Sequence, residues 1–467
     1  MSQNTLRQLM ILGIGALSVL MLFIYKKSGV TGWQTVQRTE TAATGDKGDV
    51  PEISEGNISG ETETGENTAE TSKTLEKQKA GSIKVTELKE NPELRVLICS
   101  DNYEGEYHKE LTLQCSTDYT VSYGDVTEEH KASEPVWFTL EDSWLKKGTV
   151  TLTPKEESGT FTLPELKRSQ KAPAYTGKFI VEKKEEGLRV INVVPLETYL
   201  CSVVPSEMPA DYPLEALKAQ AICARTYAVK QLSGSRLAEK GADMDDSVSF
   251  QVYNNIGRDK RTDQAVKETA GQVLGKEGNL IDALYYSTSC GLDLSQKLSE
   301  EAVFCAFLSG GGEKSYEKDE PWYRWNVYFS LEELTQMVKS GWQEDFGAVT
   351  GMEVKKREDS GVIGTLEVSG DGGTITVEGE YSIRKLLQPG KTPVTLQDGS
   401  DAPDLGMLPS AFFYLTPEYD GKKMKGYTLT GGGYGHGKGM SQNGAKHMAE
   451  AGYKCKDILR HYYADFN

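Results

Sequence analysis

Hydrophobic and polar residues alternate in several short stretches between residues 94 and 194, as in strands with one buried face. The predicted strands there are 94–99, 111–115, 120–124, 149–153, 177–182 and 187–194. The same alternation returns later in the chain, at 272–289, 365–379, 412–415 and 427–433. We therefore expect a strand-rich body.

A helical period replaces the alternation at residues 214–232, which follow Pro213, a residue suited to a first helical turn. One seam of this predicted central helix is apolar and consists of Leu214, Leu217, Ala221, Ala224, Ala228 and Leu232. Shorter helices are predicted at 331–341, at 382–387 and from about Ser441 onward. Because strands and helices do not alternate as βαβ units, the expected fold class is α+β.

The first 85 residues have a different composition. Residues 9–25 contain no charged residue and are followed by Lys26 and Lys27, a length at the lower limit for a membrane-spanning helix. A small-residue cleavage site is weak, so we expect an uncleaved membrane anchor in 1–29, with charges on both sides that leave its orientation open.

Residues 30–85 are rich in Thr, Glu, Gly and Ser and are expected to form a disordered acidic linker. Residues 86–467 would form the folded region, with a smaller strand-rich subdomain around 305–425.

Charge and cysteine content exclude some functions. The net charge is −17, which gives little support to a nucleic-acid partner and means that an anionic ligand would depend on local cations. The 7 cysteines include no CxxC pair, and the 5 histidines do not form a zinc-type spacing with them. We predict no metal and no cofactor.

Two similar pentapeptides, VVPLE and VVPSE, end in Glu197 and Glu207. The two glutamates are a catalytic pair, one of them is catalytic, or the repeat has no chemical role. Glu197 follows Pro195 at the expected first turn of a short helix, where the helix dipole favours a carboxylate. A structural role is therefore expected for Glu197.

Glu207 lies between Pro205 and Pro209, in an apolar sequence that predicts a rigid loop before the central helix. A carboxyl group held against apolar neighbours has a raised pKa, as a general acid requires. The alternative from this stretch alone is an exposed loop glutamate.

Lys218 and Arg225 are seven residues apart on the central helix, so their side chains point to nearly the same side. They are either a grip for a carboxylate on a substrate or a pair of solvated charges. Near the C-terminus, Gly432 to Lys438 matches most of a phosphate-binding loop, but Gly439 replaces the hydroxyl residue that holds magnesium. Nucleotide binding is therefore a weak alternative.

Four separated stretches, taken in order, resemble stage II sporulation protein D and its relatives in the SpoIID/LytB family. They are VVPLETYLCSVVPSEMPADYPLEALKAQAICARTYAV (193–229), DDSVSFQVYN (245–254), AVKETAGQVLGKEGNLIDALYYSTSCG (265–291) and GGGYGHGKGMSQNGAKHMAEAGYKCKDILRHYY (431–463). With weaker similarity at PWYRWNV (321–327) and EGEYSIRKLL (378–387), the resemblance covers roughly residues 90–467. An N-terminal membrane anchor also fits this family.

The resemblance implies a peptidoglycan lytic transglycosylase, which cleaves the MurNAc–GlcNAc bond without water and leaves a 1,6-anhydro end. It further implies action during engulfment, outside the cytoplasm, on denuded glycan from which an amidase partner has removed the stem peptides, alongside other sporulation membrane proteins. Glu207 would act as acid and then as base. The implied substrate-binding residues are Lys218, Arg225, Tyr286, Ser287, Ser289, His436, Ser441 and Gln442.

Some residues depart from the family pattern. Relatives that bind zinc use Cys and His shortly after the arginine helix, and KGADMDDSVSFQVY (240–253) has neither, in line with the prediction of no metal. Cys290 replaces a usual glycine, Lys438 a usual valine and Asn443 a usual tyrosine. Because the family includes amidase enhancers, a glycan-binding module that stimulates an amidase without cutting is the alternative function.

Overall fold

The computed structural model describes residues 82–463, except for 101–102, 104, 171–172, 235, 293–303, 305–306, 308–314 and 403. The predicted anchor and almost all of the predicted linker lie outside these residues. No helix within the described part of the chain is long and apolar enough to cross a membrane.

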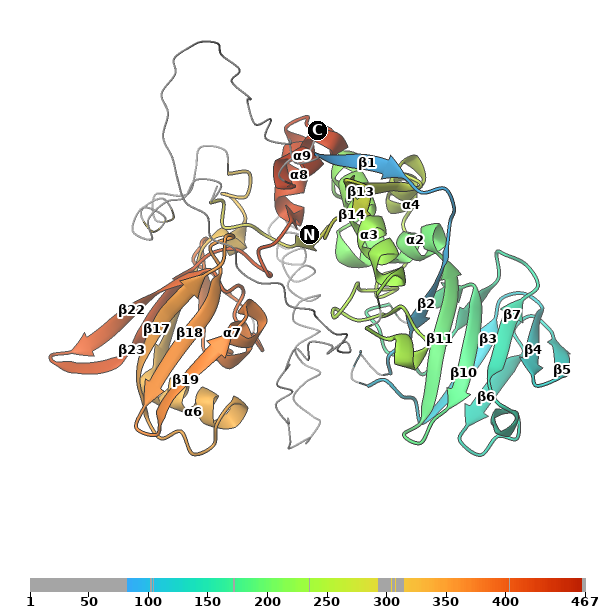
Figure 1. Ribbon diagram of the computed structural model, residues 1–467, viewed down its shortest axis with the longest axis horizontal. Coiled ribbons are helices and arrows are strands. Elements are labelled where there is room, and N and C mark those ends of the chain that lie inside the picture. Colours follow the sequence, from blue (N-terminus) through green and yellow to red (C-terminus); the bar gives the residue numbers. More distant parts are fainter. Residues whose placement is uncertain are drawn as a thin grey trace, which may run out of the picture. The chain divides into compact units, whose positions relative to one another are not determined.

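A seven-stranded sheet forms much of the N-terminal half, with the strand order β12-β2-β11-β10-β7-β4-β5 (Figure 1). Its strands are β2 (Glu93–Leu97), β4 (Tyr119–Tyr123), β5 (Val126–His130), β7 (Val150–Pro154), β10 (Lys178–Lys183), β11 (Leu188–Pro195) and β12 (Met244–Asp245). Only β12 pairs in parallel, with β2; the other pairs are antiparallel. The alternation buries one face of strands such as β4, whereas the central strand β11 is buried on both faces.

A four-stranded sheet with the order β6-β3-β8-β9 packs against it. This sheet consists of β3 (Glu110–Cys115), β6 (Pro135–Thr139), β8 (Thr160–Thr162) and β9 (Ala174–Thr176). Phe161 of β8 lies 5.6 Å from Tyr119 and 5.4 Å from Phe179 between ring centroids, and both partners are in the seven-stranded sheet. All three rings are fully buried, so the apolar residues of both sheets share one core.

The same core extends into a group of helices, whose central member is α3 (Leu214–Leu232). The others are α2 (Leu196–Glu207), α4 (Lys260–Glu268), α8 (Gln442–Glu450) and α9 (Cys455–Tyr462), and Figure 1 shows α2 and α4 beside α3. Small buried residues on α3, including Ala221 and Ala224, allow this close packing. A three-stranded sheet, β1 (Ile83–Glu87), β13 (Gln272–Lys276) and β14 (Asn279–Leu280), also contributes to this core.

A second hydrophobic core is formed by residues between Trp322 and Leu429. It contains a five-stranded sheet of β16 (Trp325–Ser330), β20 (Val394–Leu396), β21 (Asp401–Ala402), β22 (Phe413–Asp420) and β23 (Lys423–Gly431). A three-stranded sheet of β17 (Val349–Arg357), β18 (Ile363–Gly370) and β19 (Gly373–Glu378) and the helices α6 (Leu331–Gly341) and α7 (Glu380–Leu386) complete it (Figure 1). Among the described residues, short 3-10 helices lie at Leu145–Lys147, Ala238–Lys240 and Pro321–Tyr323.

The mixed α+β, strand-rich character predicted from the sequence is confirmed, and so are the helices at 214–232 and 331–341. Two expectations were wrong. A strand was expected to continue to residue 289, but after Leu280 the only strand in the described residues 281–289 is the two-residue β15 (Tyr285–Tyr286). It pairs in parallel with β24 (Met440–Ser441). Residues 205–207 are helical rather than a loop, because α2 continues through Pro205 to Glu207.

Candidate functional site

Glu197 and Glu207 stand at opposite ends of α2, in the first turn and at the last residue. Both oxygens of Glu197 accept from Arg225, with Oε1 2.7 Å from Nε and Oε2 2.7 Å from Nη2. The Gly271 N–H also donates to Oε1, at 3.1 Å. Glu197 is therefore a structural residue that joins α2 to α3.

Arg225 is completely buried in this arrangement. Its remaining N–H groups donate to protein carbonyls, including Val266 O at 3.2 Å and Gln272 O at 3.3 Å. All three nitrogens of its guanidinium group thus donate hydrogen bonds within the protein. The structure thus places Arg225 away from solvent and from any arriving ligand.

Lys218, the other predicted cation on α3, is ion-paired as well. Its Nζ lies 2.6 Å from Glu268 Oε2 and 3.0 Å from Glu215 Oε1. The hydrogen bond that Lys218 donates to Glu268 is the main cause of a raised pKa of Lys218. Two carboxylates already neutralise this cation, which is largely covered, with 18% of its side chain exposed.

Glu207 reaches its position as the final residue of α2. Pro205 in the last turn lacks an N–H, and the Met208 N–H donates to Val204 O and closes the helix. Pro209 follows immediately, so the chain turns away there. Glu207 remains partly exposed, while Val203, Val204 and Met208 around it are buried.

The Glu207 carboxyl is held by two donors in a largely apolar setting. The Val252 N–H donates to its Oε1 at 2.6 Å. Burial raises the pKa of Glu207 to about 7, against the opposing effects of the Val252 N–H and of a hydrogen bond from the Tyr285 side chain. A carboxyl with such a pKa is protonated in about half of the molecules near neutral pH and can both donate and accept a proton.

Tyr285 belongs to a chain of buried polar groups behind Glu207. Its hydroxyl accepts from Gln251 Nε2 at 2.9 Å, and the Tyr199 hydroxyl lies 3.4 Å from Gln251 Oε1. Tyr199 and Gln251 are almost completely buried. This chain fixes the direction of the Tyr285 hydroxyl, which then orients the carboxyl.

The family resemblance assigned Tyr286 to substrate binding, and the residue that contacts Glu207 is its neighbour Tyr285. Neighbouring strand residues face opposite sides, so only one of the two tyrosines in β15 can point to the glutamate. Tyr286 instead lies 5.5 Å from the His436 ring and lines a cavity of about 350 Å³ together with Ser289 and Phe412. The alternation within the strand was a usable signal, but it does not say which face meets Glu207.

The remaining predicted residues gather around β15 and β24. Gln442 Nε2 donates to the Glu207 carbonyl at 3.0 Å, so Gln442 is next to the glutamate. The Ser441 hydroxyl is buried and accepts from the Ser289 and Gly444 N–H groups, at 3.2 and 3.1 Å. Ser287 accepts the Asn443 N–H through its carbonyl. His436 Nε2 lies 2.9 Å from Tyr285 O, and burial lowers the pKa of His436.

The glycines of 431–439 let this segment approach residues 284–290. A Cβ on Gly439 would lie 1.9 Å from Leu284 O, and one on Gly435, where φ is +113°, would lie 2.8 Å from Tyr286 Cβ. Both positions thus exclude any side chain. Backbone packing accounts for the glycine density that gave the partial match to a phosphate-binding loop.

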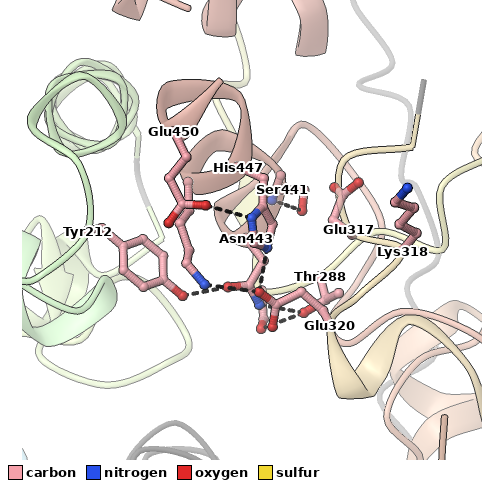
Figure 2. A network of polar contacts seen from close by, with 12 residues as sticks. Tyr212, Thr288, Glu317, Lys318, Glu320, Ser441, Asn443, His447 and Glu450 are labelled. Carbon is pink, nitrogen blue, oxygen red and sulfur yellow. Dashed lines mark hydrogen bonds and ion pairs between the residues drawn. The ribbon is translucent and has the colours of Figure 1, made fainter. Parts of the chain in front are cut away.

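Figure 2 shows the polar network that fixes α8 beside this site. The Tyr212 hydroxyl donates to Asn443 Oδ1, and Asn443 Nδ2 donates to Thr288 Oγ1 at 2.9 Å. His447 lies between two carboxylates, with Nε2 2.7 Å from Glu320 and Nδ1 2.8 Å from Glu450. These bonds tie the helix that carries Gln442 to three other segments of the chain.

The described residues thus bring Glu207, Tyr285 and Gln442 together, and they place Tyr286 and Ser289 at a neighbouring cavity. Lys218 and Arg225 are held in ion pairs. Among the residues that the structure describes, no group of three or more His, Cys, Asp or Glu side chains could hold a metal ion. The chemistry available at Glu207 is proton transfer by one carboxyl group.

Comparison with known proteins gives the family. Residues 184–275 match the model of a family described as stage II sporulation protein, and residues 279–439 match a domain of unknown function, DUF8618. The first match contains Glu207, Lys218 and Arg225. The second contains Tyr285, Tyr286 and His436.

Curated relatives agree with this match. The chain is 32% identical to stage II sporulation protein D of Bacillus amyloliquefaciens over 291 residues, which cover 58% of this chain and 74% of the relative. Stage II sporulation protein D of Bacillus subtilis is 30% identical with the same coverage. An amidase enhancer of B. subtilis is 31% identical, but the match spans only 39% of its length. The chain belongs to the stage II sporulation protein D family, a family of sporulation proteins.

Proposed function

We propose that this protein is a lytic transglycosylase that cleaves the MurNAc–GlcNAc bonds of peptidoglycan during sporulation. The observation that carries the proposal is the state of Glu207. It is a carboxyl with a pKa raised to about 7 by burial and with two fixed donors, on a residue that is itself partly exposed. A lone carboxyl poised near neutral pH suits a reaction in which one group serves as acid and then as base.

In the first step, protonated Glu207 gives its proton to the glycosidic oxygen, and the bond from C1 of MurNAc to that oxygen breaks. In the second step the Glu207 carboxylate removes the proton from the C6 hydroxyl of the same MurNAc, and O6 bonds to C1. The product carries a 1,6-anhydro ring, and the carboxyl is protonated again. No water and no second carboxylate take part, unlike in most glycoside hydrolases.

The protein groups around Glu207 suit both steps. The Val252 N–H and the Tyr285 hydroxyl hold the carboxyl in one orientation and stabilise its ionised form between the two proton transfers. Gln442 fixes the backbone of Glu207 from the opposite helix, α8. Glu197 has no part in the reaction, because both of its oxygens are engaged by Arg225.

The biological setting is part of the proposal. The stage II sporulation relatives support a role in sporulation, and an amidase enhancer among the relatives supports a cell-wall amidase as a partner. The preferred substrate would be glycan denuded of stem peptides. Residues 1–29 would anchor the protein in the cell membrane, with the catalytic region outside the cytoplasm.

Digestion of denuded peptidoglycan by the full-length protein, followed by mass spectrometry, tests this function. We expect 1,6-anhydro-muramyl ends from the wild-type protein and none from Glu207→Gln, which keeps the shape and the hydrogen-bond acceptor of the side chain. Asp211→Asn is the matched control, because Asp211 is an exposed carboxylate close in sequence. Anhydro ends from Glu207→Gln in wild-type amounts would reject Glu207 as the acid.

A second function is supported by one comparison, the amidase enhancer. In that case the protein binds glycan and stimulates an amidase but does not cut. Amidase stimulation by wild type and Glu207→Gln alike, with no anhydro ends from either, would favour this function.

A further inference from the structure

Arg236 is an exposed cation in the turn between α3 and the 3-10 helix Ala238–Lys240. Its Nη1 donates to Ser249 O at 3.1 Å, and its guanidinium carbon lies 4.1 Å from the centroid of the Phe250 ring. The Phe250 side chain is almost completely buried. One face of the guanidinium is therefore fixed on an aromatic ring, which leaves its edge for other hydrogen bonds.

Arg236 differs from the two cations on α3 in having no carboxylate partner among the described residues. Lys218 and Arg225 lie within ion-pair distance of carboxylates. Arg236 forms no ion pair within the part of the chain that the structure describes, and its single hydrogen bond there is to a backbone carbonyl. In a protein with a net charge of −17, an exposed arginine held in this way is a ready receptor for an anion.

Arg236 is connected to Glu207 through the segment 249–252. Ser249 and Phe250 hold the guanidinium, Gln251 donates to Tyr285, and Val252 donates to Glu207. Two residues of chain span at most about 7 Å, so the backbones of Phe250 and Val252 lie no farther apart than this. One short segment thus positions both the cation and the acid.

The Tyr227 side chain is a second indication that Arg236 and Glu207 are near each other. Burial raises the pKa of the Tyr227 phenol, the positive charge of Arg236 lowers it, and the negative charges of Asp245 and Glu207 raise it. Arg236 and Glu207 therefore both lie within electrostatic reach of one phenolic oxygen.

Asp245 is the carboxylate to consider as a competitor for Arg236. It is within electrostatic reach of Arg236, but the two do not form an ion pair. Its Oδ1 accepts instead from the Ser247 N–H and hydroxyl, at 2.9 and 2.6 Å. Asp245 leaves the guanidinium edge available.

We propose that Arg236, supported by Phe250, is a subsite for the lactyl carboxylate of a muramic acid residue whose stem peptide has been removed. The inference rests on the proposed function, because it names the group of the glycan that the site recognises. In intact peptidoglycan this carboxylate is an amide and carries no charge. A subsite that places an arginine at the lactyl group therefore selects denuded glycan, because only this substrate has a negative charge at that position.

Binding measurements with catalytically disabled protein test the subsite without turnover. Full-length Glu207→Gln would be compared with the double variants Glu207→Gln/Arg236→Gln and Glu207→Gln/Arg236→Lys. Glu207→Gln/Lys422→Gln is the charge-matched control, since it removes an exposed positive charge in the turn between β22 and β23. The ligands are denuded glycan oligomers and neutral N-acetylglucosamine oligomers of equal length.

Arg236→Gln should weaken binding of denuded glycan about tenfold or more, as expected for the loss of a charge-assisted hydrogen bond. Arg236→Lys should recover part of that loss, and the Lys422 control should bind like its parent. Neutral oligomers should bind equally to all four proteins. Equal binding of denuded glycan with and without Arg236 would overturn the subsite, and so would an equal loss for the neutral oligomers, since the arginine would then act on the fold.

Failure of the two proposals can be told apart. If wild-type protein produces no anhydro ends but Arg236 still governs binding of denuded glycan, the transglycosylase proposal fails and the subsite stands. If anhydro ends appear and Arg236→Gln has no effect on binding or on the KM for denuded glycan, the subsite alone fails.

Discussion

Glu197 and Arg225 form a bidentate ion pair across α2 and α3, with both N–O distances at 2.7 Å and the arginine completely buried. This ion pair gives Glu197 a structural role that the second glutamate of the sequence repeat, Glu207, does not share. Glu197 is engaged by Arg225 at the beginning of α2, whereas Glu207 at the end of the same helix has no cationic partner in the described part of the chain and accepts from two donors.

Breaking this pair should destabilise the fold. Glu197→Gln leaves the buried guanidinium without its counter-charge, and we expect a loss of about 3 kcal/mol in the free energy of unfolding by urea denaturation. The double variant Glu197→Gln/Arg225→Met should recover part of the loss, because it removes the uncompensated charge. The exposed pair Lys230–Asp282 is the control, and Asp282→Asn should cost less than about 1 kcal/mol. A Glu197→Gln protein of wild-type stability would contradict the structural role.

The rate of glycan cleavage should fall as pH rises through about 7. The first step requires protonated Glu207, and burial raises the pKa of this carboxyl to about 7. The measurement is kcat/KM for denuded glycan from about pH 5 to about pH 9, a range that covers both sides of the titration of Glu207. The fall in rate above about pH 7 is the alkaline limb of this profile. A rate that stays constant across this range would contradict the assignment.

Tyr285→Phe should move this alkaline limb to higher pH. The Tyr285 hydroxyl donates to the Glu207 carboxylate and lowers its pKa, so its removal raises the pKa of Glu207 further. The first proton transfer, which leaves Glu207 as a carboxylate, should become slower because that carboxylate has lost a stabilising donor, so kcat should fall near neutral pH. Tyr227→Phe is a suitable comparison, because no hydrogen bond from Tyr227 contributes to the pKa of Glu207. An unshifted limb in Tyr285→Phe would show that the hydroxyl does not control the acid.

The stability of Glu207→Gln relative to the wild-type protein should increase from acidic to alkaline pH. The pKa of Glu207 is raised from 4.5 to about 7 on folding, so the folded state binds more protons between these values. Wild-type stability therefore falls as pH rises through this window, and Glu207→Gln lacks that loss. Because Glu207 is partly exposed, we expect a gain of about 1–3 kcal/mol at pH 8 relative to pH 4. Equal pH dependence of unfolding in the two proteins would count against a raised pKa.

His447 should contribute stability only on the acidic side. The hydrogen bond to Glu320 is the main cause of the raised pKa of His447, so the stabilising charge is fully present below about 6.5 and is lost as pH rises through the higher folded pKa. Thermal unfolding of His447→Gln should therefore differ from that of the wild-type protein more at about pH 5.5 than at about pH 9. These two pH values lie on opposite sides of the titration of His447. A constant difference would mean that charge is not the source of the effect.

Local patterns in the sequence predicted much of the fold. The central helix at 214–232 and most of the early strands follow directly from the spacing of apolar residues. Proline at 205 misled the prediction for 205–207, because α2 continues to Glu207 although Pro205 cannot donate a hydrogen bond to the Cys201 carbonyl. The helices α4 and α9 carry polar residues through most of their length and were not predicted from the pattern.

The candidate site was harder to predict because its contacts join distant parts of the chain. The bond from Val252 to Glu207 spans 45 residues and that from Gln442 spans 235, and no local pattern encodes them. The shared side of Lys218 and Arg225 on α3 suggested a grip for a substrate. That spacing could not reveal that Glu197, Glu215 and Glu268 already occupy both cations. Arg236 has no distinguishing sequence context, and only its place on Phe250 makes it notable.

The central claim is that one carboxyl group, Glu207, cleaves glycan without water. Digestion of denuded glycan in water enriched in ¹⁸O, with mass analysis of the new ends, tests it most directly. The account predicts anhydro ends without ¹⁸O from the wild-type protein and no new ends from Glu207→Gln. New reducing ends that carry ¹⁸O, or unlabelled anhydro ends still formed by Glu207→Gln, would contradict it.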